Sequence, residues 1–457
     1  MNVLLISQAY PPYPVVGALR ARKLAEAFRA QGHRVVVVTE RLPDEDAGLR
    51  VDEPDLRVQT VTLGDRYRVR AMRLLRRVTR FGRPSAVSDV PPWETEGVNA
   101  ADAAAADVSA ADGAARAGWL RRFALGLLWL PDDEQRFILP ALRTARAVLR
   151  DTPIDVVYTT APYFSTHLVG LLLKRSARVR WVAEFRDPWT DQRRILVTDP
   201  VSVIEAMHRW LERRCLLAAD KVVAVTEGAR RLLAEKVPPA QRGKFILALN
   251  GIDELSAPDT AAPAGPRRIV YAGTFYYNRD PRPFLAALAA VRQRHGLGPE
   301  ELRVDFVGRC RSYDGASVER MVADHGLTDL VHFHDWMSSA DAQAMLRSAD
   351  LLFLIALMQP LQVPNKLYDY LGTRRPMLAV VDAGGETEGM LHQVGGHFVV
   401  PVARRQQADA DRLAEALDHW LCGSADAGSA TSAADEATLR SWLASRQMEL
   451  VVSAAVA

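Results

Sequence analysis

Short, wholly apolar runs alternate with amphipathic helical patterns along both halves of this 457-residue chain. Near the start, residues 2–7 read NVLLIS and residues 34–39 read RVVVVT, with a helical pattern over 18–31 between them. Strands that are apolar on both faces are typical of a parallel sheet that helices cover on both sides. The sequence therefore predicts an α/β protein built from doubly wound, Rossmann-like sheets.

The alternation stops once and then restarts, which indicates two domains. It runs through residues 1–250, breaks off in an Ala- and Pro-rich linker over 251–266, and resumes over 267–422. A chain of this length is too long for one hydrophobic core and fits two domains of about 200 residues each. If the two sheets face each other across a cleft, the carboxyl ends of both sets of strands surround a ligand.

Three segments depart from this pattern. Residues 84–118 form an insertion that is Ala-rich from residue 97 onward, and we assign it no chemistry. Residues 65–83 are a basic helical segment that suits either peripheral contact with an anionic membrane or a solvated surface. Residues 433–452 are expected to be one terminal helix that can return to the N-terminal domain.

Composition narrows the class of protein and its compartment. The formal net charge of +3 is near neutral, so the chain as a whole implies no nucleic-acid partner. The three cysteines are too widely spaced for a disulfide framework or a metal site, which favours a reducing compartment. The N-terminus lacks a signal-peptide pattern, and no run approaches the roughly 20 apolar residues of a membrane span. We expect a cytoplasmic protein, either soluble or peripheral on the inner face of the membrane.

The segment Pro364–Tyr370, PNKLYDY, directly follows an apolar strand pattern and carries the strongest binding signal. Pro364 suits the first turn of a helix, where the N–H groups of Asn365 and Lys366 have no partner within the helix. Those groups, the helix dipole and the Lys366 charge would attract a diphosphate, and Asp369 could accept hydrogen bonds from ribose hydroxyls. The alternative is a simple surface ion pair between the two charged residues.

A second loop of the same predicted sheet adds another basic side chain. The sequence VYAGTFYYNRD places Gly273 and Thr274 at the end of a strand, where backbone can approach a ligand, and Arg279 before the next helix. The Arg279 guanidinium is always charged and can bind phosphate through two hydrogen bonds. Because carboxyl ends of neighbouring parallel strands share one edge of a sheet, the two loops predict a single nucleotide pocket.

These motifs resemble those of the GT-B glycosyltransferases, in particular the retaining glycosyltransferase family 4. That family has a Gly-x-x-x-x-x-Lys/Arg loop, matched here by Gly273 and Arg279, and an acid on the later helix, matched by Asp369. The resemblance implies transfer of a sugar from a nucleoside diphosphate to an acceptor hydroxyl, with retention and with no metal or other cofactor. Arg279 and Lys366 would be catalytic by stabilising the departing diphosphate.

The chain also departs from the family pattern at two positions. Leu361 stands where the family has an earlier acid that contacts the donor sugar, and Thr274 stands where a basic residue often follows the loop glycine. The resemblance therefore supports a nucleotide pocket without naming the sugar.

Acceptor-side candidates follow strands of the N-terminal domain. Gly17 would let the first loop approach the donor, and Arg20 lies on the helix that follows. His167 is a third catalytic candidate, placed to contact the donor sugar or the acceptor, although a lone His is more often structural. The other acceptor-side candidates are Glu184, Arg186 and Asp187 in the sequence EFRDPW. For the last two, an ion pair that braces the turn is the alternative.

We therefore expect a glycosyltransferase of the hexosyltransferase type that acts in surface polysaccharide or glycolipid synthesis. Its partners would be a nucleotide-sugar donor and a sugar or lipid-linked sugar acceptor. One alternative is a sugar-nucleotide 2-epimerase on the same fold, which needs acids and bases but no acceptor. Another is a non-catalytic nucleotide-binding scaffold, which would fit the leucine at position 361.

Overall fold

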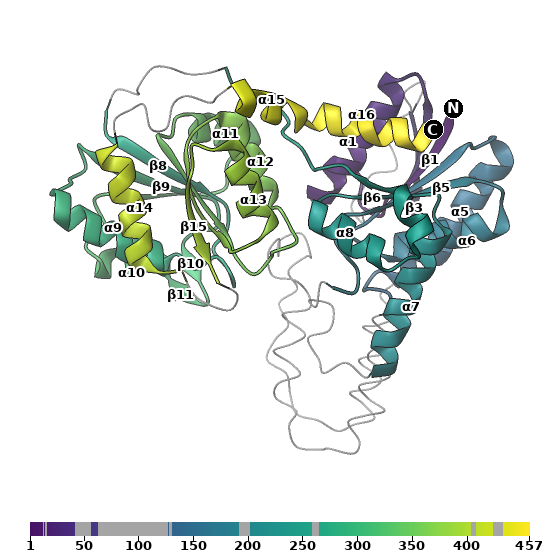
Figure 1. Ribbon diagram of the computed structural model, residues 1–457, viewed down its shortest axis with the longest axis horizontal. Helices are drawn as coiled ribbons and strands as arrows, with labels where there is room; N and C mark the ends of the chain where they lie inside the picture. The colour runs from purple at the N-terminus through teal and green to yellow at the C-terminus, as the bar shows by residue number, and fades with distance from the viewer. Residues whose placement is uncertain are drawn as a thin grey trace, which may run out of the picture. The chain divides into compact units, whose positions relative to one another are not determined.

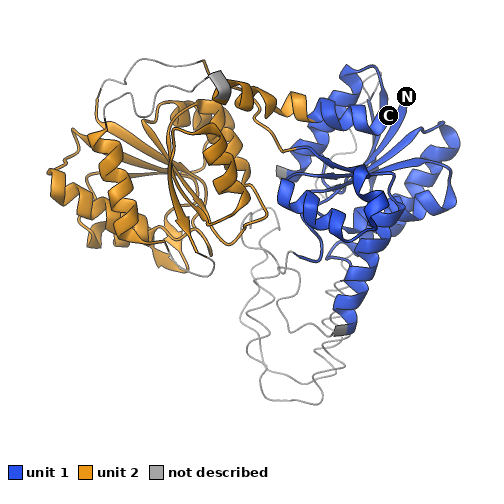
Figure 2. Cartoon of the chain, in the orientation of Figure 1, with its two compact units in different colours: residues 1–248, 448–457 blue, residues 249–447 orange. Residues whose placement is uncertain are grey.

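The chain divides into two compact units (Figure 2), and each is described by itself. Unit 1 comprises Met1–Ala248 and Met448–Ala457, and unit 2 comprises Leu249–Gln447. The computed structural model describes residues 1–11, 13, 16–41, 56–62, 127, 130–191, 202–257, 265–403, 408–423 and 433–457. The predicted basic segment 65–83 and insertion 84–118 lie outside the described residues, as do residues 258–264 of the predicted linker.

The described residues of unit 1 form a parallel seven-stranded sheet in the order β3-β2-β1-β4-β5-β6-β7 (Figure 1). Its strands are β1 (Asn2–Ile6), β2 (Arg34–Glu40), β3 (Leu56–Val61), β4 (Val156–Thr160), β5 (Arg180–Phe185), β6 (Lys221–Ala224) and β7 (Phe245–Leu247). Its helices are α1 (Val16–Ala30), α5 (Ile138–Asp151), α6 (Ser165–Ser176), α7 (Ser202–Ala218) and α8 (Glu227–Glu235), with 3-10 turns η2 (Gln135–Phe137) and η4 (Pro239–Lys244). The reversal of strand order beside β1 is that of a doubly wound Rossmann-like sheet.

The central strand β1 shows why the strand sequences of this unit are apolar throughout and do not alternate between apolar and polar residues. Successive side chains of a strand point to opposite faces, so both faces of β1 need cover. Val3 and Leu5 pack with Phe28 of α1 on one face. Leu4 and Ile6 belong to the core on the other face. Helices on both sides of the sheet therefore bury every residue of the apolar run, as the sequence predicts.

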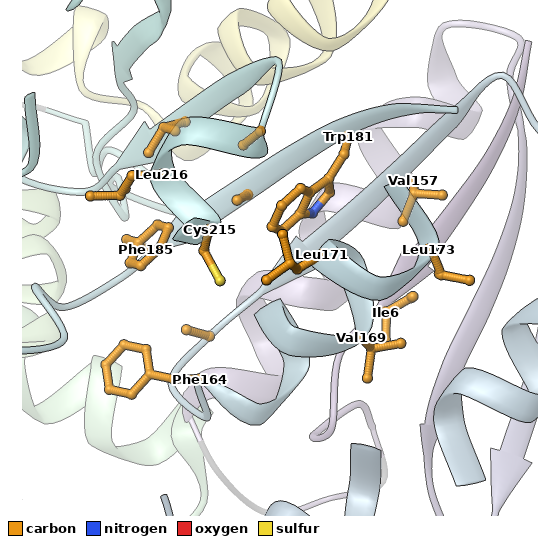
Figure 3. Close-up of a cluster of buried hydrophobic side chains, with 14 of the residues drawn as sticks. Ile6, Val157, Phe164, Val169, Leu171, Leu173, Trp181, Phe185, Cys215 and Leu216 are labelled. Carbon is orange, nitrogen blue, oxygen red and sulfur yellow. The ribbon is translucent and has the colours of Figure 1, made fainter. Parts of the chain in front are cut away.

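Figure 3 shows the second of these cores, where Trp181 of β5 lies among side chains of α6 and α7. The indole Nε1 of Trp181 donates a hydrogen bond to Thr159 Oγ1 over 2.9 Å. Gly170 of α6 leaves the space that this indole occupies, since a Cβ there would overlap the ring. Leu171 and Cys215 complete the contact from the two helices.

The described residues of unit 2 form a parallel six-stranded sheet in the order β12-β9-β8-β13-β14-β15, plus the hairpin β10-β11. The strands are β8 (Arg267–Ala272), β9 (Leu302–Val307), β10 (Ser312–Tyr313), β11 (Ala316–Ser317), β12 (Val331–His334), β13 (Leu351–Ala356), β14 (Met377–Asp382) and β15 (Phe398–Val402). The helices are α9 (Arg282–His295), α10 (Val318–Asp324), α11 (Ser339–Arg347), α12 (Asn365–Thr373), α13 (Glu386–Val394), α14 (Ala410–Cys422) and α15 (Ala433–Ser441). Helices α9 and α14 cover one face of this sheet, and α11, α12 and α13 cover the other (Figure 1).

The segment expected to be one helix over 433–452 is instead two helices, α15 and α16 (Ala444–Val456). The interruption arises because Leu443 forms a parallel bridge with Ile252. The Ile252 N–H donates to the Trp442 carbonyl, and the Ala444 N–H donates to the Ile252 carbonyl, each over 2.8 Å. Gly251, at φ +84°, lies so close to Ala444 that no side chain would fit between them.

Helix α16 supplies part of the core of unit 1. Its side chains Met448, Val451, Val452 and Ala455 pack in the same cluster as the central strand β1. Arg180 of β5 donates to the carbonyls of Ala455 and Val456, at 3.1 and 2.7 Å. Among the residues that the structure describes, no helix is long and apolar enough to cross a membrane.

Candidate active site

Helix α12 begins one residue later than the sequence suggests. Pro364 was expected within the first turn, but it is the N-cap, with φ −63° and an extended ψ of 140°. N-cap residues have a non-helical backbone, so the helix proper starts at Asn365. The N–H groups of Asn365 and Lys366 are then among the first of the helix, which have no carbonyl one turn earlier to bond.

The loop between β13 and α12 is held by the end of β14. The Asp382 carboxylate accepts hydrogen bonds from the N–H groups of Met358 and Gln359, at 2.9 and 2.6 Å. The Glu386 N–H donates to the Pro360 carbonyl over 2.9 Å. Leu361, the residue in place of the family acid, lies within this braced loop. The path into α12 is therefore held by the Asp382 carboxylate and by a backbone hydrogen bond to Pro360.

The Lys366 side chain reaches from α12 to the end of β8. Its Nζ lies 4.9 Å from the centroid of the Tyr271 ring and directly beside Gly273, where a Cβ would overlap the ammonium group. The Nζ is buried and has no hydrogen-bond partner among the residues that the structure describes. Burial, together with the positive charge of Arg279, lowers the Lys366 pKa to about 7. The space that a side chain at position 273 would occupy is thus filled by the Lys366 ammonium.

Arg279 supplies a second positive charge to the same place. Its guanidinium lies 4.8 Å from the centroid of the Tyr276 ring, and its Nε is buried without a hydrogen-bond partner. Its charge lowers the Lys366 pKa, which Asp369 on the next turn of α12 partly opposes. The structure therefore brings together Gly273, Arg279, Lys366 and Asp369, as expected from strands β8 and β13 being neighbours.

Thr274 takes part through its backbone. Its carbonyl accepts a hydrogen bond from the Tyr271 hydroxyl over 3.1 Å. The Gly273 N–H donates to the Val307 carbonyl over 2.7 Å. These bonds hold the loop under the Lys366 ammonium, and the donor-binding role of Thr274 stays a prediction.

Two of the acceptor-side candidates, Arg20 and Glu184, form a buried ion pair. The Glu184 carboxylate accepts from Arg20 Nη2 at 2.9 Å and Nε at 3.1 Å, and both side chains are buried. The hydroxyls of Thr160 and Tyr158 donate to the same carboxylate, at 2.6 and 2.8 Å. Burial alone would raise the Glu184 pKa, but Arg20 and the two hydroxyls lower it overall. Among the residues that the structure describes, the partners of this carboxylate all belong to unit 1.

Gly17, Arg186 and Asp187 lie together at the end of β5. The Arg186 guanidinium occupies the space beside Gly17, where a Cβ would lie 2.7 Å from Arg186 Nη1. Burial and the nearby Arg20 lower the Arg186 pKa, whereas the charges of Glu184 and Asp187 raise it. The glycine thus makes room for an arginine, and the electrostatic contact with Asp187 is the one expected for a braced turn.

The chain is similar to sucrose-phosphate synthase from Thermosynechococcus elongatus, with TM-score 0.62, 15% identity, and 99% of this chain and 97% of that chain covered. It is also similar to HepE from Anabaena in complex with UDP-glucose, with TM-score 0.55, 12% identity, and 99% and 98% covered. A UDP-forming trehalose-phosphate synthase from Burkholderia xenovorans has TM-score 0.58, 12% identity, and 100% and 98% covered. No curated protein matches the chain.

These likenesses confirm the predicted fold class of two Rossmann-like domains. Residues 97–247 match a family model described as a glycosyl transferase 4-like domain. The chain is a glycosyltransferase with the GT-B fold. That the two sheets of the glycosyltransferase face a common cleft stays a prediction.

The His167 side chain lies inside the fold of the glycosyltransferase and not at a surface that a substrate could reach. The side chain is fully buried, with its ring 4.3 Å from that of Phe185 and Nδ1 2.9 Å from Thr159 Oγ1. Its Nε2 is buried without a hydrogen-bond partner, and burial lowers the His167 pKa to about 3. The predicted contact with the donor sugar or acceptor therefore has no support from this geometry, because the ring is enclosed and neutral.

The buried neutral ring should make stability fall with acid. The folded-state pKa of about 3 lies below the ordinary value of 6.5, so between these pH values only the unfolded chain binds the proton. We expect His167 to lower the free energy of unfolding by about 1.4 kcal/mol for each pH unit below 6.5. Urea unfolding of the wild type and His167→Phe at pH 7, 6 and 5 measures this. Parallel losses in the two proteins would contradict it.

Two aromatic residues of the glycosyltransferase site were not predicted from the sequence. Tyr271 lies under the Lys366 ammonium and Tyr276 under the Arg279 guanidinium, as cation–π contacts. Both belong to the run VYAGTFYY, where aromatic side chains flank Gly273 on either side. That spacing was the available signal, since a ring beside a loop glycine can support a cation that enters the loop.

Proposed function

We propose that this glycosyltransferase moves a sugar from a nucleoside diphosphate sugar to an acceptor hydroxyl, with retention at the anomeric carbon. The observation that carries the proposal is the buried Lys366 ammonium, which has no hydrogen-bond partner and lies close to a second cation, Arg279. Two positive side chains repel each other, and the positive end of the helix dipole repels both. Holding them together is therefore unfavourable unless an anion binds there. A diphosphate supplies the negative charge that both side chains lack.

The proposed chemistry is electrostatic. As the bond from the sugar to the diphosphate breaks, negative charge grows on the leaving phosphate. Lys366, Arg279 and the first N–H groups of α12 would stabilise that charge through preorganised donors, with no metal and no other cofactor. The leaving phosphate would take the acceptor proton, so the proposal assigns no protein base and leaves His167 out. Asp369, one turn along α12, would accept hydrogen bonds from the ribose hydroxyls.

The partners and the setting are part of the same proposal. HepE was solved with UDP-glucose, which supports a nucleotide-sugar donor here. For the acceptor we propose a sugar or lipid-linked sugar in surface polysaccharide or glycolipid synthesis, with a cytoplasmic enzyme that binds the membrane peripherally. Gly17, Arg186 and Asp187 are the proposed acceptor-side residues, whereas the enclosed pair of Arg20 and Glu184 would shape that side without contacting the acceptor.

A thermal-shift screen with nucleotide sugars tests donor binding. A ligand at 100 times its dissociation constant should add about 2.7 kcal/mol to the free energy of unfolding. Arg279→Ala should lose most of that shift. The matched control is Arg282→Ala at the first residue of α9, because Arg282 is half exposed and is already paired with Asp280 at 2.6 Å. No shift with any nucleotide sugar, or equal shifts in both variants, would sink the donor site.

Transfer and its stereochemistry need a second measurement. With the donor found in the screen and lipid or sugar acceptors, NMR of the product gives the anomeric configuration. The same configuration in donor and product is expected, and an inverted product would remove retention from the proposal.

Donor affinity should depend on pH through Lys366. Its pKa of about 7 means that the free enzyme carries this charge below pH 7 and loses it above. A bound diphosphate raises that pKa, so binding above pH 7 must take up a proton. We expect the dissociation constant to be flat below pH 7 and to rise by up to about tenfold per pH unit above it. Calorimetry between pH 6 and 9 measures this, and Lys366→Met should give a weak, flat profile.

A further inference from the structure

Helices α5, α6 and α7 lie on the same face of the unit 1 sheet (Figure 1). Helix α6 packs against both of its neighbours, so the outer sides of the three helices form one surface. Their inner sides contribute Ala145, Leu171 and Leu216 to the core. What a partner of this part of unit 1 would meet is therefore the set of side chains on the outer sides.

Helix α5 carries three arginines in one row on its outer side. Arg143, Arg146 and Arg150 are spaced by three and four residues, which places them on one side of the helix. All three are exposed, and none has a hydrogen bond or ion pair through its side chain with another residue that the structure describes. Like charges at this spacing repel each other, so the row favours an anionic partner.

The two neighbouring helices add positive charge to the same surface. Arg175 lies in the last turn of α6, Arg178 follows that helix, and Arg213 lies on α7. Each of them is exposed and, within the described part of the chain, is also unpaired. We call these six residues the arginine face: Arg143, Arg146, Arg150, Arg175, Arg178 and Arg213.

The acids of the three helices offset little of that charge. Glu205 is paired with Arg209 on the same helix. Glu212 is buried and is paired with Lys236 over 2.7 Å. Asp151, the last residue of α5, is the remaining acid in the three helical sequences. The arginine face therefore presents charge of almost one sign.

Two apolar side chains accompany these arginines. Leu139, four residues before Arg143 on α5, and Trp210 of α7 are each 60% exposed. The Arg214 guanidinium lies 5.8 Å from the centroid of the Trp210 ring. An exposed tryptophan beside arginine is typical of a membrane interface, where the ring lies at the depth of the headgroups and the guanidinium binds lipid phosphate. A nucleic-acid duplex would bind the arginines through its phosphates but offers no apolar layer for Leu139.

We propose that the arginine face, together with Leu139 and Trp210, binds the surface of an anionic lipid membrane. The arginines bind lipid phosphate groups, and the two apolar side chains enter the boundary between headgroups and acyl chains. This contact rests on the peripheral membrane binding proposed above and gives it a surface on described helices, apart from the predicted segment 65–83. It needs no nucleotide sugar, so vesicle binding and the donor-induced thermal shift succeed or fail separately.

Cosedimentation with vesicles tests the role of the arginines. We expect the full-length protein to bind equimolar phosphatidylglycerol and phosphatidylcholine vesicles, and to bind pure phosphatidylcholine vesicles much more weakly. Each arginine near an anionic surface contributes about fivefold in affinity, so Arg143→Gln with Arg146→Gln should bind about 25-fold more weakly than the wild type. The matched control is Arg320→Gln with Arg347→Gln, because these are exposed arginines of unit 2 whose side chains are unpaired among the described residues. Equal binding to the two kinds of vesicle, or equal binding by the two double variants, would overturn the proposal.

Tryptophan quenching tests whether Trp210 enters the membrane. Vesicles with brominated acyl chains quench an indole that reaches the bilayer. We expect them to quench the wild type and Trp336→Phe, whereas Trp210→Phe should lose most of the quenching. Trp336 is the matched control because it lies in unit 2 and is 85% exposed. Quenching that survives in Trp210→Phe would overturn the membrane contact, and a DNA duplex that binds as tightly as the anionic vesicles would assign the arginines to nucleic acid instead.

Discussion

Replacing Lys366 with Met should make the protein more stable and nearly abolish sugar transfer. Met keeps the length of the side chain beside Gly273 and removes a buried charge that has no hydrogen-bond partner. Relieving an unsatisfied buried donor should raise the free energy of unfolding by about 1–3 kcal/mol. Losing one donor to the developing charge of the leaving phosphate should slow transfer by about 10²–10³-fold. Urea unfolding and an initial-rate assay measure the two effects.

The opposite signs make this prediction specific to a binding role. A structural lysine would lower stability when replaced, and activity would fall with the folded fraction. Arg282→Ala, at the exposed start of α9, is the control and should change neither quantity by much. A Lys366→Met protein that is less stable than the wild type, or that transfers sugar at the normal rate, would contradict the role proposed for the ammonium.

Glu184→Ala should be among the most destabilising substitutions in the chain. It would leave the Arg20 guanidinium buried without its counter-charge, and the hydroxyls of Tyr158 and Thr160 without their acceptor. Removing one partner of a buried ion pair costs about 3–5 kcal/mol. Chemical unfolding monitored by tryptophan fluorescence measures the loss, and Trp181 in the neighbouring core is a suitable reporter.

A double substitution distinguishes the effect of the two charges from the effect of the volume that the two side chains fill. In Arg20→Met with Glu184→Leu both charges are gone, and apolar groups of similar size replace them. Such replacements of buried pairs are often neutral, so the part of the loss that comes from the unpaired charge should return, while the part that comes from the Tyr158 and Thr160 hydroxyls should remain. Two results would contradict the stabilising role of the carboxylate: a free energy of unfolding for Glu184→Ala within about 1 kcal/mol of the wild type, or a double variant that is no more stable than Glu184→Ala.

The grouping of Gly273, Arg279 and Lys366 could be predicted from the sequence because it depends on sheet topology. Each residue follows an apolar strand, and the two strands are neighbours in a parallel sheet. What could not be predicted was the direction of the lysine side chain. Nothing in PNKLYDY shows that its ammonium enters the space left by a glycine some ninety positions earlier, because that contact depends on how α12 packs.

The acceptor-side residues show where sequence reasoning ends. Polar residues at a strand end can face a ligand or each other, and EFRDPW looks the same in both cases. Glu184 turned inward because Arg20, Tyr158 and Thr160 offer it four hydrogen bonds, and these partners come from two elements, α1 and β4, that are far apart in the sequence. His167 was ambiguous for the same reason, since only the fold shows that the rings of Phe164 and Phe185 enclose it.

Because α16 completes the core of unit 1, that core cannot be finished until the end of the chain has been synthesised. Residues 448–457 leave the ribosome after all of unit 2, so the face of β1 that they cover waits for about 200 further residues. At synthesis rates of about 5–20 residues per second, the delay is about 10–40 s. During that time Val3 and Leu5 belong to an unfinished core that exposes apolar surface. Unit 2, which is continuous in sequence, can fold first, and the domain that begins the chain becomes the last to be completed.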